Sequence, residues 1–130
     1  MTSTPADTVH AWLAAVNAAN VDSVLALSAP DIAMIGPRGT ARGHDVLRGW
    51  LQHAGATFET RAVYALRDAV VVAQRGVWRG PQTGGAESIV EVATRFRVSA
   101  GLIAELERYA ELDAALRAAG LTPADDVARA

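Results

Sequence analysis

The sequence predicts an α+β domain in which helices near the start of the chain pack on an antiparallel sheet. Hydrophobic residues first recur at helical spacing, four β-rich runs separated by turn signals follow, and a last helical pattern comes near the end. Helices segregated from a run of strands are typical of this class. With 130 residues, 51% of them hydrophobic, the chain is expected to form one domain over residues 1–130.

Residues 4–20 predict an amphipathic helix. Thr4 suits the N-cap, Pro5 suits the first helical position, and Asp7 follows the cap by three residues. The apolar residues that share one face of this helix are Val9, Trp12, Leu13 and Val16. We therefore expect this face to be buried.

A short helix, a short strand and a third helix are expected next. Asn20 suits the cap of a helix in NVDSVLALSA, and DIAMIGPRG predicts a strand that ends at Gly36. In GHDVLRGWLQHAG the apolar residues again share one face, and Gly55 suits the end of the helix.

An antiparallel meander is predicted from four β-rich runs: TFETRAVYAL, AVVVAQRGVWRG, SIVEVATRFRV and LIAELERYAEL. The turns between them are expected at GPQTGG, Arg67-Asp68 and Ser99-Ala100-Gly101. A closing helix, DAALRAAG, should end at Gly120. The core then covers about residues 5–120 and leaves a tail at 121–130.

Charge and composition exclude several kinds of partner. The net charge is -2 and the basic residues are scattered, so neither nucleic acid nor an anionic membrane is expected to bind. Without cysteine the chain has no disulfide and no thiolate. His10, His44 and His53 share no ligand spacing, and no glycine-rich segment has a phosphate-loop pattern, so we expect no metal and no cofactor. No leader pattern or long apolar run is present, and we expect a cytoplasmic protein.

Two long stretches of the chain resemble one family. VHAWLAAVNAANVDSVLALSAPDIAMIGPRGTARGHDVLRGWL resembles the opening of nuclear transport factor 2-like, or SnoaL-like, proteins, and GLIAELERYAELDAAL resembles their last strand and final helix. The resemblance covers about residues 8–120. It implies a cone, in which the concave face of a strongly curved sheet closes on the helices around a pocket, commonly in a homodimer.

The last hairpin predicts which residues face that pocket. A three-residue loop at 99–101 places Thr94 opposite Leu106 and Phe96 opposite Ala104, and Arg108 shares their face. The other face carries a ladder of opposite charges suited to solvent, made of Arg95, Arg97, Glu105 and Glu107.

The preceding hairpin predicts a second set of pocket residues and a dimer surface. A two-residue turn at Arg67-Asp68 pairs Tyr64 with Val71, and on the same face Thr60 with Arg75 and Phe58 with Val77. The opposite face is too apolar for water, which predicts a homodimer interface there or, as the alternative, cover by the chain's own tail. The residues of this face are Val63, Val70, Val72 and Trp78.

Two enzyme classes of the superfamily are tested against these positions. As the resemblance implies, its epoxide hydrolases use two carboxylates bridged by an arginine. Arg75 matches that arginine, but Val77 and Arg108 replace the carboxylates, so this chemistry cannot run as it does there. The resemblance also implies three catalytic positions of ketosteroid isomerases, for a tyrosine, a carboxylate base and a protonated acid. In this chain they hold Trp12, Gly36 and Thr94, so isomerase activity is not expected.

We therefore expect a mainly apolar pocket with arginine character. Arg75 and Arg108 would bind an acidic or carbonyl-bearing metabolite, with His53 as a candidate base; the alternative is structural pairing with Asp31, Glu87, Glu111 or backbone carbonyls. The function expected is a small-molecule binding protein or a SnoaL-like enzyme, and the alternative is a non-catalytic dimerisation module with a vestigial pocket. The expected pocket residues are Trp12, Val16, Met34, Trp50, Phe58, Tyr64, Arg75, Val77, Thr94, Phe96, Leu106 and Arg108.

Overall fold

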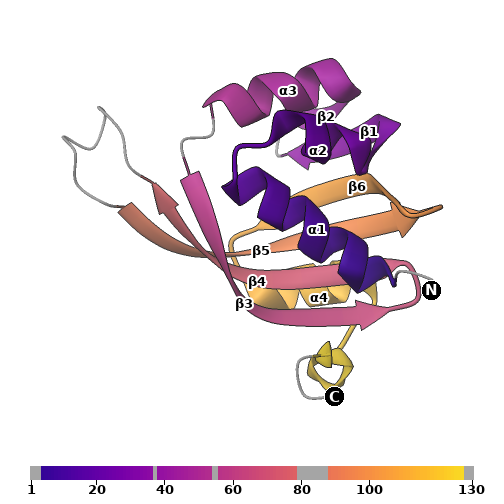
Figure 1. Ribbon diagram of the computed structural model, residues 1–130. Coiled ribbons are helices and arrows are strands. Elements are labelled where there is room, and N and C mark those ends of the chain that lie inside the picture. The colour runs from indigo at the N-terminus through magenta and orange to yellow at the C-terminus, as the bar shows by residue number, and fades with distance from the viewer. Residues whose placement is uncertain (1–3, 37, 54–55, 79–87, 128–130) are drawn as a thin grey trace.

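A curved, mixed six-stranded sheet with helices on both faces forms the protein in the computed structural model, which describes residues 4–36, 38–53, 56–78 and 88–127 (Figure 1). The α+β class is confirmed. The elements, in chain order, are α1 (Pro5–Asn17), α2 (Val21–Ala26), β1 (Ser28–Gly36), β2 (Gly39–Arg42), α3 (His44–His53), β3 (Ala56–Leu66), β4 (Ala69–Trp78), β5 (Ser88–Ser99), β6 (Leu102–Tyr109), α4 (Leu112–Ala119) and a 3-10 turn, η2 (Pro123–Asp125). None of the described helices is long and apolar enough to cross a membrane.

The strand order is β2-β1-β6-β5-β4-β3. The predicted antiparallel meander from β3 to β6 is confirmed, and β1 adds to it by parallel pairing with β6. Strand β2 was not predicted, because its four residues are all exposed and show no apolar alternation. Gly39 and Gly43, with φ of 123° and 102°, adopt backbone conformations at the ends of β2 that favour glycine.

Helix α1 begins as its sequence predicts. The Thr4 hydroxyl accepts from the Asp7 amide at 3.1 Å, while the Thr4 amide donates to the Asp7 carboxylate at 3.0 Å. The buried face of the helix includes Val9, Trp12 and Leu13. At its C-terminal end, Asn17 bonds to both the amide and the carbonyl of Phe58, at 2.9 and 2.8 Å. These two bonds fasten the helix to β3, an edge strand of the sheet.

Each face of the sheet has its own hydrophobic cluster. On the concave face, residues of α1, α2 and α3 pack against the inner side chains of β3 to β6 in the larger cluster. On the outer face, Ala115 and Leu116 of α4 pack with Tyr64, Val71 and Ala93, and Figure 1 shows α4 on the side of the strands opposite to α1. The sheet is thus a middle layer between two sets of helices.

The β5–β6 hairpin has the predicted faces except next to its turn, and its register differs from the predicted one. Its turn has two residues, Ala100 and Gly101, whose φ values of 53° and 77° suit a tight hairpin. A register shift follows between Arg97 and Val98, so that Phe96 pairs with Leu106, and the predicted partner Ala104 was wrong. In the same register Thr94 lies opposite Arg108 and Arg95 opposite Glu107. Thr94, Phe96, Leu106 and Arg108 keep their predicted face, but Ile103 lies opposite Val98 in the larger core cluster, where Leu102 was predicted, so the prediction was wrong next to the turn.

The β3–β4 hairpin has the predicted turn, but the faces of β4 and of β3 from Ala62 to the turn are the reverse of those expected, whereas Phe58 points into the concave side as predicted. Tyr64 pairs with Val71, as predicted; a register shift between Thr60 and Ala62 then brings Glu59, instead of Thr60, opposite Arg75. The residues predicted to form a dimer surface lie in the larger core cluster instead: Val63, Val70 and Val72. That surface was wrong, because both sides of the hairpin are apolar and alternation alone cannot tell which is concave. The side chain of Trp78 lies outside the described residues.

Candidate functional site

A hollow lies on the concave face, between α1, α3 and the strands β3 to β6. About 270 Å³ lies between these elements when the space open to solvent is included, and side chains fill most of the interior. Most of the expected pocket residues line it, together with two that were not expected, Leu13 and Gln74. The lining residues are Trp12, Leu13, Val16, Trp50, Phe58, Gln74, Thr94, Phe96, Leu106 and Arg108.

Aromatic rings form the buried walls of this hollow. The rings of Trp12 and Phe96 meet edge to face, with their centroids 5.5 Å apart and their planes at 70°. The indole of Trp12 is fixed by its N–H, which donates to the Ser28 hydroxyl at 3.0 Å; this hydroxyl in turn donates to the Val24 carbonyl at 2.7 Å. Because the N–H of Trp12 is bonded to Ser28, its ring presents an apolar surface to the hollow.

Arg108 is the charged residue of the lining. Its guanidinium carbon lies 4.7 Å from the centroid of the Phe58 ring and 5.8 Å from that of Trp50. The residue as a whole is exposed, so it marks the solvent end of the hollow. Burial of part of the side chain lowers the pKa of Arg108 from its ordinary value. In the part of the chain that the structure describes, no carboxylate lies within ion-pair distance of this guanidinium.

Gln74 and Thr94 form a polar pair at the buried end of the hollow. They are 2% and 4% exposed, and the Thr94 hydroxyl donates to the Gln74 side-chain oxygen at 2.8 Å. The prediction placed Thr94 in the pocket but missed Gln74, because the assumed faces of β4 were reversed. A glutamine between Ala73 and Arg75 in an otherwise apolar run was the signal that could have pointed to it.

Arg75 lies on the outer face of the sheet, so its predicted place in the pocket was wrong. Its Nε donates to a carboxylate oxygen of Glu91 at 3.4 Å, and the two side chains are 38% and 65% exposed. This is a structural pair of the kind that the alternative described, although its partner is neither Asp31 nor Glu111. Glu87 lies outside the described residues.

The remaining predicted site residues are also placed away from the hollow. Tyr64 is buried in the outer cluster beside α4, and Val77 shares the face of Arg75 because the two are separated by one residue in a strand. Met34, on β1, packs against the larger core cluster but does not line the hollow. His53 ends α3, and its side chain lies outside the described residues.

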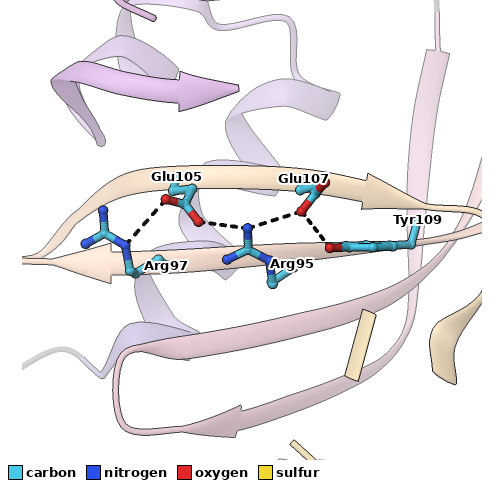
Figure 2. A network of polar contacts seen from close by, with 5 residues as sticks. All are labelled: Arg95, Arg97, Glu105, Glu107 and Tyr109. Atoms are coloured by element: carbon cyan, nitrogen blue, oxygen red, sulfur yellow. Dashed lines mark hydrogen bonds and ion pairs between the residues drawn. The ribbon is translucent and has the colours of Figure 1, made fainter. Parts of the chain in front are cut away.

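The charge ladder on the outer face is more buried than predicted, and Figure 2 shows its polar contacts. One guanidinium nitrogen of Arg95, Nη2, contacts Glu105 at 2.7 Å and Glu107 at 3.2 Å, and the Tyr109 hydroxyl donates to Glu107 at 2.6 Å. Burial acts to lower the pKa of Arg95, but its hydrogen bonds with the two glutamates outweigh burial and raise it. Burial and the bond to Glu107 raise the pKa of Tyr109. Predicted as a solvent surface, these residues instead form a connected, partly desolvated network.

The hollow therefore offers few functional groups. Its described lining contains one guanidinium, one amide and one hydroxyl, and no carboxylate, histidine or tyrosine. Among the described residues, no three histidine, aspartate or glutamate side chains are grouped as metal ligands would be. This lining can bind an anion or a carbonyl and enclose an apolar body, but it offers no side-chain base.

Comparison with known proteins gives the family and the fold. Residues 9–106 match the profile described as the SnoaL-like domain. A search of curated proteins finds no match. Among solved structures, the chain is similar to an NTF2-like protein of unknown function from Burkholderia pseudomallei, with a TM-score of 0.74 and 19% identity over 91% of this chain and 98% of that one.

Two further solved structures are similar over most of their length. TerC, co-crystallised with polyporic acid, has a TM-score of 0.74 and 18% identity over 86% of this chain and 95% of its own. SalBIII, an epoxide hydrolase/cyclase-like enzyme in pyran ring formation in the polyether salinomycin, has a TM-score of 0.74 and 15% identity over 84% and 92%. At these identities the similarity shows the fold alone, and it confirms the nuclear transport factor 2-like cone.

Proposed function

The chain belongs to the SnoaL-like domain family, and on that premise we propose that it binds, or acts on, a small and mainly apolar molecule with an acidic or carbonyl group in the concave hollow. The expected chemistry is retained, but of the two arginines expected to bind this group only Arg108 lines the hollow. The similarity to TerC, co-crystallised with polyporic acid, supports an acidic ligand by analogy.

The position of Arg108 is the observation that carries this proposal. A guanidinium that lies over aromatic rings keeps the N–H groups at its edge available to an anion. Partial burial without a described carboxylate partner leaves its charge poorly compensated, and a ligand carboxylate would compensate it through charge-assisted, bidentate hydrogen bonds. Trp12, Trp50 and Phe58 would enclose the apolar part of the same molecule.

An enzymatic form of this function would be cyclase-like, as the similarity to SalBIII suggests by analogy. Arg108 would stabilise negative charge that develops on a substrate oxygen. Because the described lining has no carboxylate, histidine or tyrosine, the proton would move through bound water or through His53, whose role stays a proposal.

The test is a thermal-shift comparison of matched ligands on three proteins. 4-Phenylbutanoic acid and its neutral hydrocarbon analogue 1-phenylbutane should both be offered to the wild type, Arg108→Met and Arg75→Leu. We expect the acid to raise the unfolding temperature more than the hydrocarbon in the wild type and in Arg75→Leu, because binding to the native state stabilises it. The preference for the acid should disappear in Arg108→Met.

Two results would contradict the proposal. The acid preference could persist in Arg108→Met, or it could be lost in Arg75→Leu instead. If no compound raises the unfolding temperature of the wild type, the result favours the alternative, a non-catalytic dimerisation module. Homodimerisation is a separate proposal, and analytical ultracentrifugation of the purified protein tests it. The exposed apolar residues Ile89 and Val90 at the start of β5 are candidates for the dimer contact.

A further inference from the structure

A buried amide lies at the inner end of the hollow, on β4. Gln74 is 2% exposed, among the largest fully buried side chains of the protein, and its neighbours in the lining are mostly apolar. Glutamine is seldom fully buried unless its polar atoms are bonded, because desolvating an amide is unfavourable. The partners of this amide are therefore informative.

Only one end of the amide has a partner among the described residues. The Thr94 hydroxyl bonds to the Gln74 oxygen at 2.8 Å, and no bond to the Gln74 nitrogen is present in the described chain. A hydroxyl can donate or accept, so the amide could turn by 180° and keep this bond. In either orientation Thr94 bonds to one of the two polar atoms of the amide, and the other polar atom faces the hollow that Gln74 lines.

The hollow thus has two polar positions that differ in depth. Gln74 and Thr94 are almost fully buried, whereas Arg108 is exposed and its guanidinium lies over the rings of Phe58 and Trp50. Thr94 and Arg108 are direct neighbours across β5 and β6, so both positions belong to one continuous surface. A single small molecule could contact both.

We infer that Gln74, held by Thr94, is a specificity-determining residue that selects ligands carrying a ketone or hydroxyl in addition to the acidic group. This inference rests on the proposed function of the hollow. The substrate class is then an apolar keto acid or hydroxy acid: its acid binds Arg108 and its second oxygen bonds to the free end of the amide. A ligand without that oxygen leaves the buried amide unpaired and binds more weakly.

Four probes separate the two polar contacts. 1-Phenylbutane carries neither group, butyrophenone carries the ketone, 4-phenylbutanoic acid carries the acid, and 4-oxo-4-phenylbutanoic acid carries both. Their dissociation constants should be measured at fixed salt on the wild type, Gln74→Met and Thr94→Val. The matched control is Gln52→Met, which makes the same substitution at an exposed position of α3.

In the wild type and in Gln52→Met, the keto acid should bind about 3–10-fold more tightly than the plain acid, which is the range of one neutral hydrogen bond. The ratio of the two dissociation constants, plain acid over keto acid, should fall to about one in Gln74→Met. In Thr94→Val, where the Gln74 amide has lost its hydrogen bond, the ratio should lie between one and the wild-type value. Circular dichroism establishes that each variant is folded. If Gln74→Met does not fold, Thr94→Val carries the test.

The failures of the two proposals are distinguishable. If the wild type binds the acid but does not prefer the keto acid, the role of Gln74 is overturned and the proposed function stands. If neither acid binds, the proposed function fails, and the comparison of butyrophenone with 1-phenylbutane then decides on Gln74 alone. A keto preference that persists in Gln74→Met overturns the inference in every case.

Discussion

Replacement of Arg95 by methionine should be far more costly than the same replacement of Arg75, although both arginines lie on the outer face of the sheet and contact glutamates. Arg95→Met removes the contacts of Nη2 with Glu105 at 2.7 Å and with Glu107 at 3.2 Å. The three side chains are only 14%, 24% and 26% exposed. Methionine keeps much of the apolar length, but it leaves two neighbouring carboxylates with little water around them.

The burial of the network sets the expected magnitude. An exposed ion pair contributes about 0–1 kcal/mol to stability, and removal of one partner from a fully buried pair costs about 3–5 kcal/mol. Arg95 and its glutamates lie between these limits, so we expect a loss of about 2–3 kcal/mol. For a chain of 130 residues this corresponds to a fall in Tm of about 7–11 °C.

Arg75→Met is the matched control. Its contact with Glu91 is longer, 3.4 Å, and the side chains are 38% and 65% exposed, so the loss should stay below about 1 kcal/mol. Thermal and urea unfolding, followed by circular dichroism at pH 7, measure both variants. Equal losses in the two variants would refute the reasoning.

Three further predictions concern hydrogen bonds of the fold. Asn17→Ala removes two hydrogen bonds to the backbone of Phe58 and should lower the free energy of unfolding in urea by about 2 kcal/mol. Asn17→Asp should lower it further, because one carboxylate oxygen then faces the Phe58 carbonyl oxygen. A loss in Asn17→Asp that is equal to or smaller than that in Asn17→Ala would contradict this. Ser28→Ala leaves the buried indole N–H of Trp12 without its partner and should lower the free energy of unfolding by about 1–3 kcal/mol. Tryptophan fluorescence should change as well. An unaltered free energy of unfolding would show that the bond is dispensable. The raised pKa of Tyr109 means that the folded state holds this proton more tightly than the unfolded state, so its contribution is complete below the ordinary value of 10.0 and is lost as pH rises beyond it. Alkaline unfolding curves should therefore fall less steeply for Tyr109→Phe, and an identical slope would count against the assignment.

Local signals in the sequence were sufficient for much of the fold. The capping box of Thr4 and Asp7 depends on residues three positions apart, so it can be predicted without knowledge of the tertiary structure. The faces of β5 and β6 were also predictable over Thr94–Val98 and Ala104–Glu107, because charged residues alternate there with apolar residues and Thr94. For this reason Arg108, Thr94 and Phe96 were correctly expected in the hollow.

The β3–β4 hairpin shows where such signals end. Val70, Val71 and Val72 are all completely buried, since the strand is covered by α1 on one side and by α4 on the other. In such a run apolar and polar residues do not alternate, so the sequence does not indicate which side chains face the concave side of the sheet. The choice between Gln74 and Arg75 as the pocket residue depended on that face alone, and it is set by long-range packing that no local pattern encodes.

Completion of the sheet depends on two segments that are distant in the sequence. Strand β1 pairs in parallel with β6, so that Met34 lies beside Leu106. During synthesis or refolding, β1 has no partner other than β2 until almost all of the meander has formed. Closing so long a loop is entropically costly, and we expect it to be among the slower steps of folding. Because Leu106 and Arg108 arrive with β6, the lining of the hollow is incomplete in a partly folded chain, and the proposed ligand binding should therefore report on the last stage of assembly.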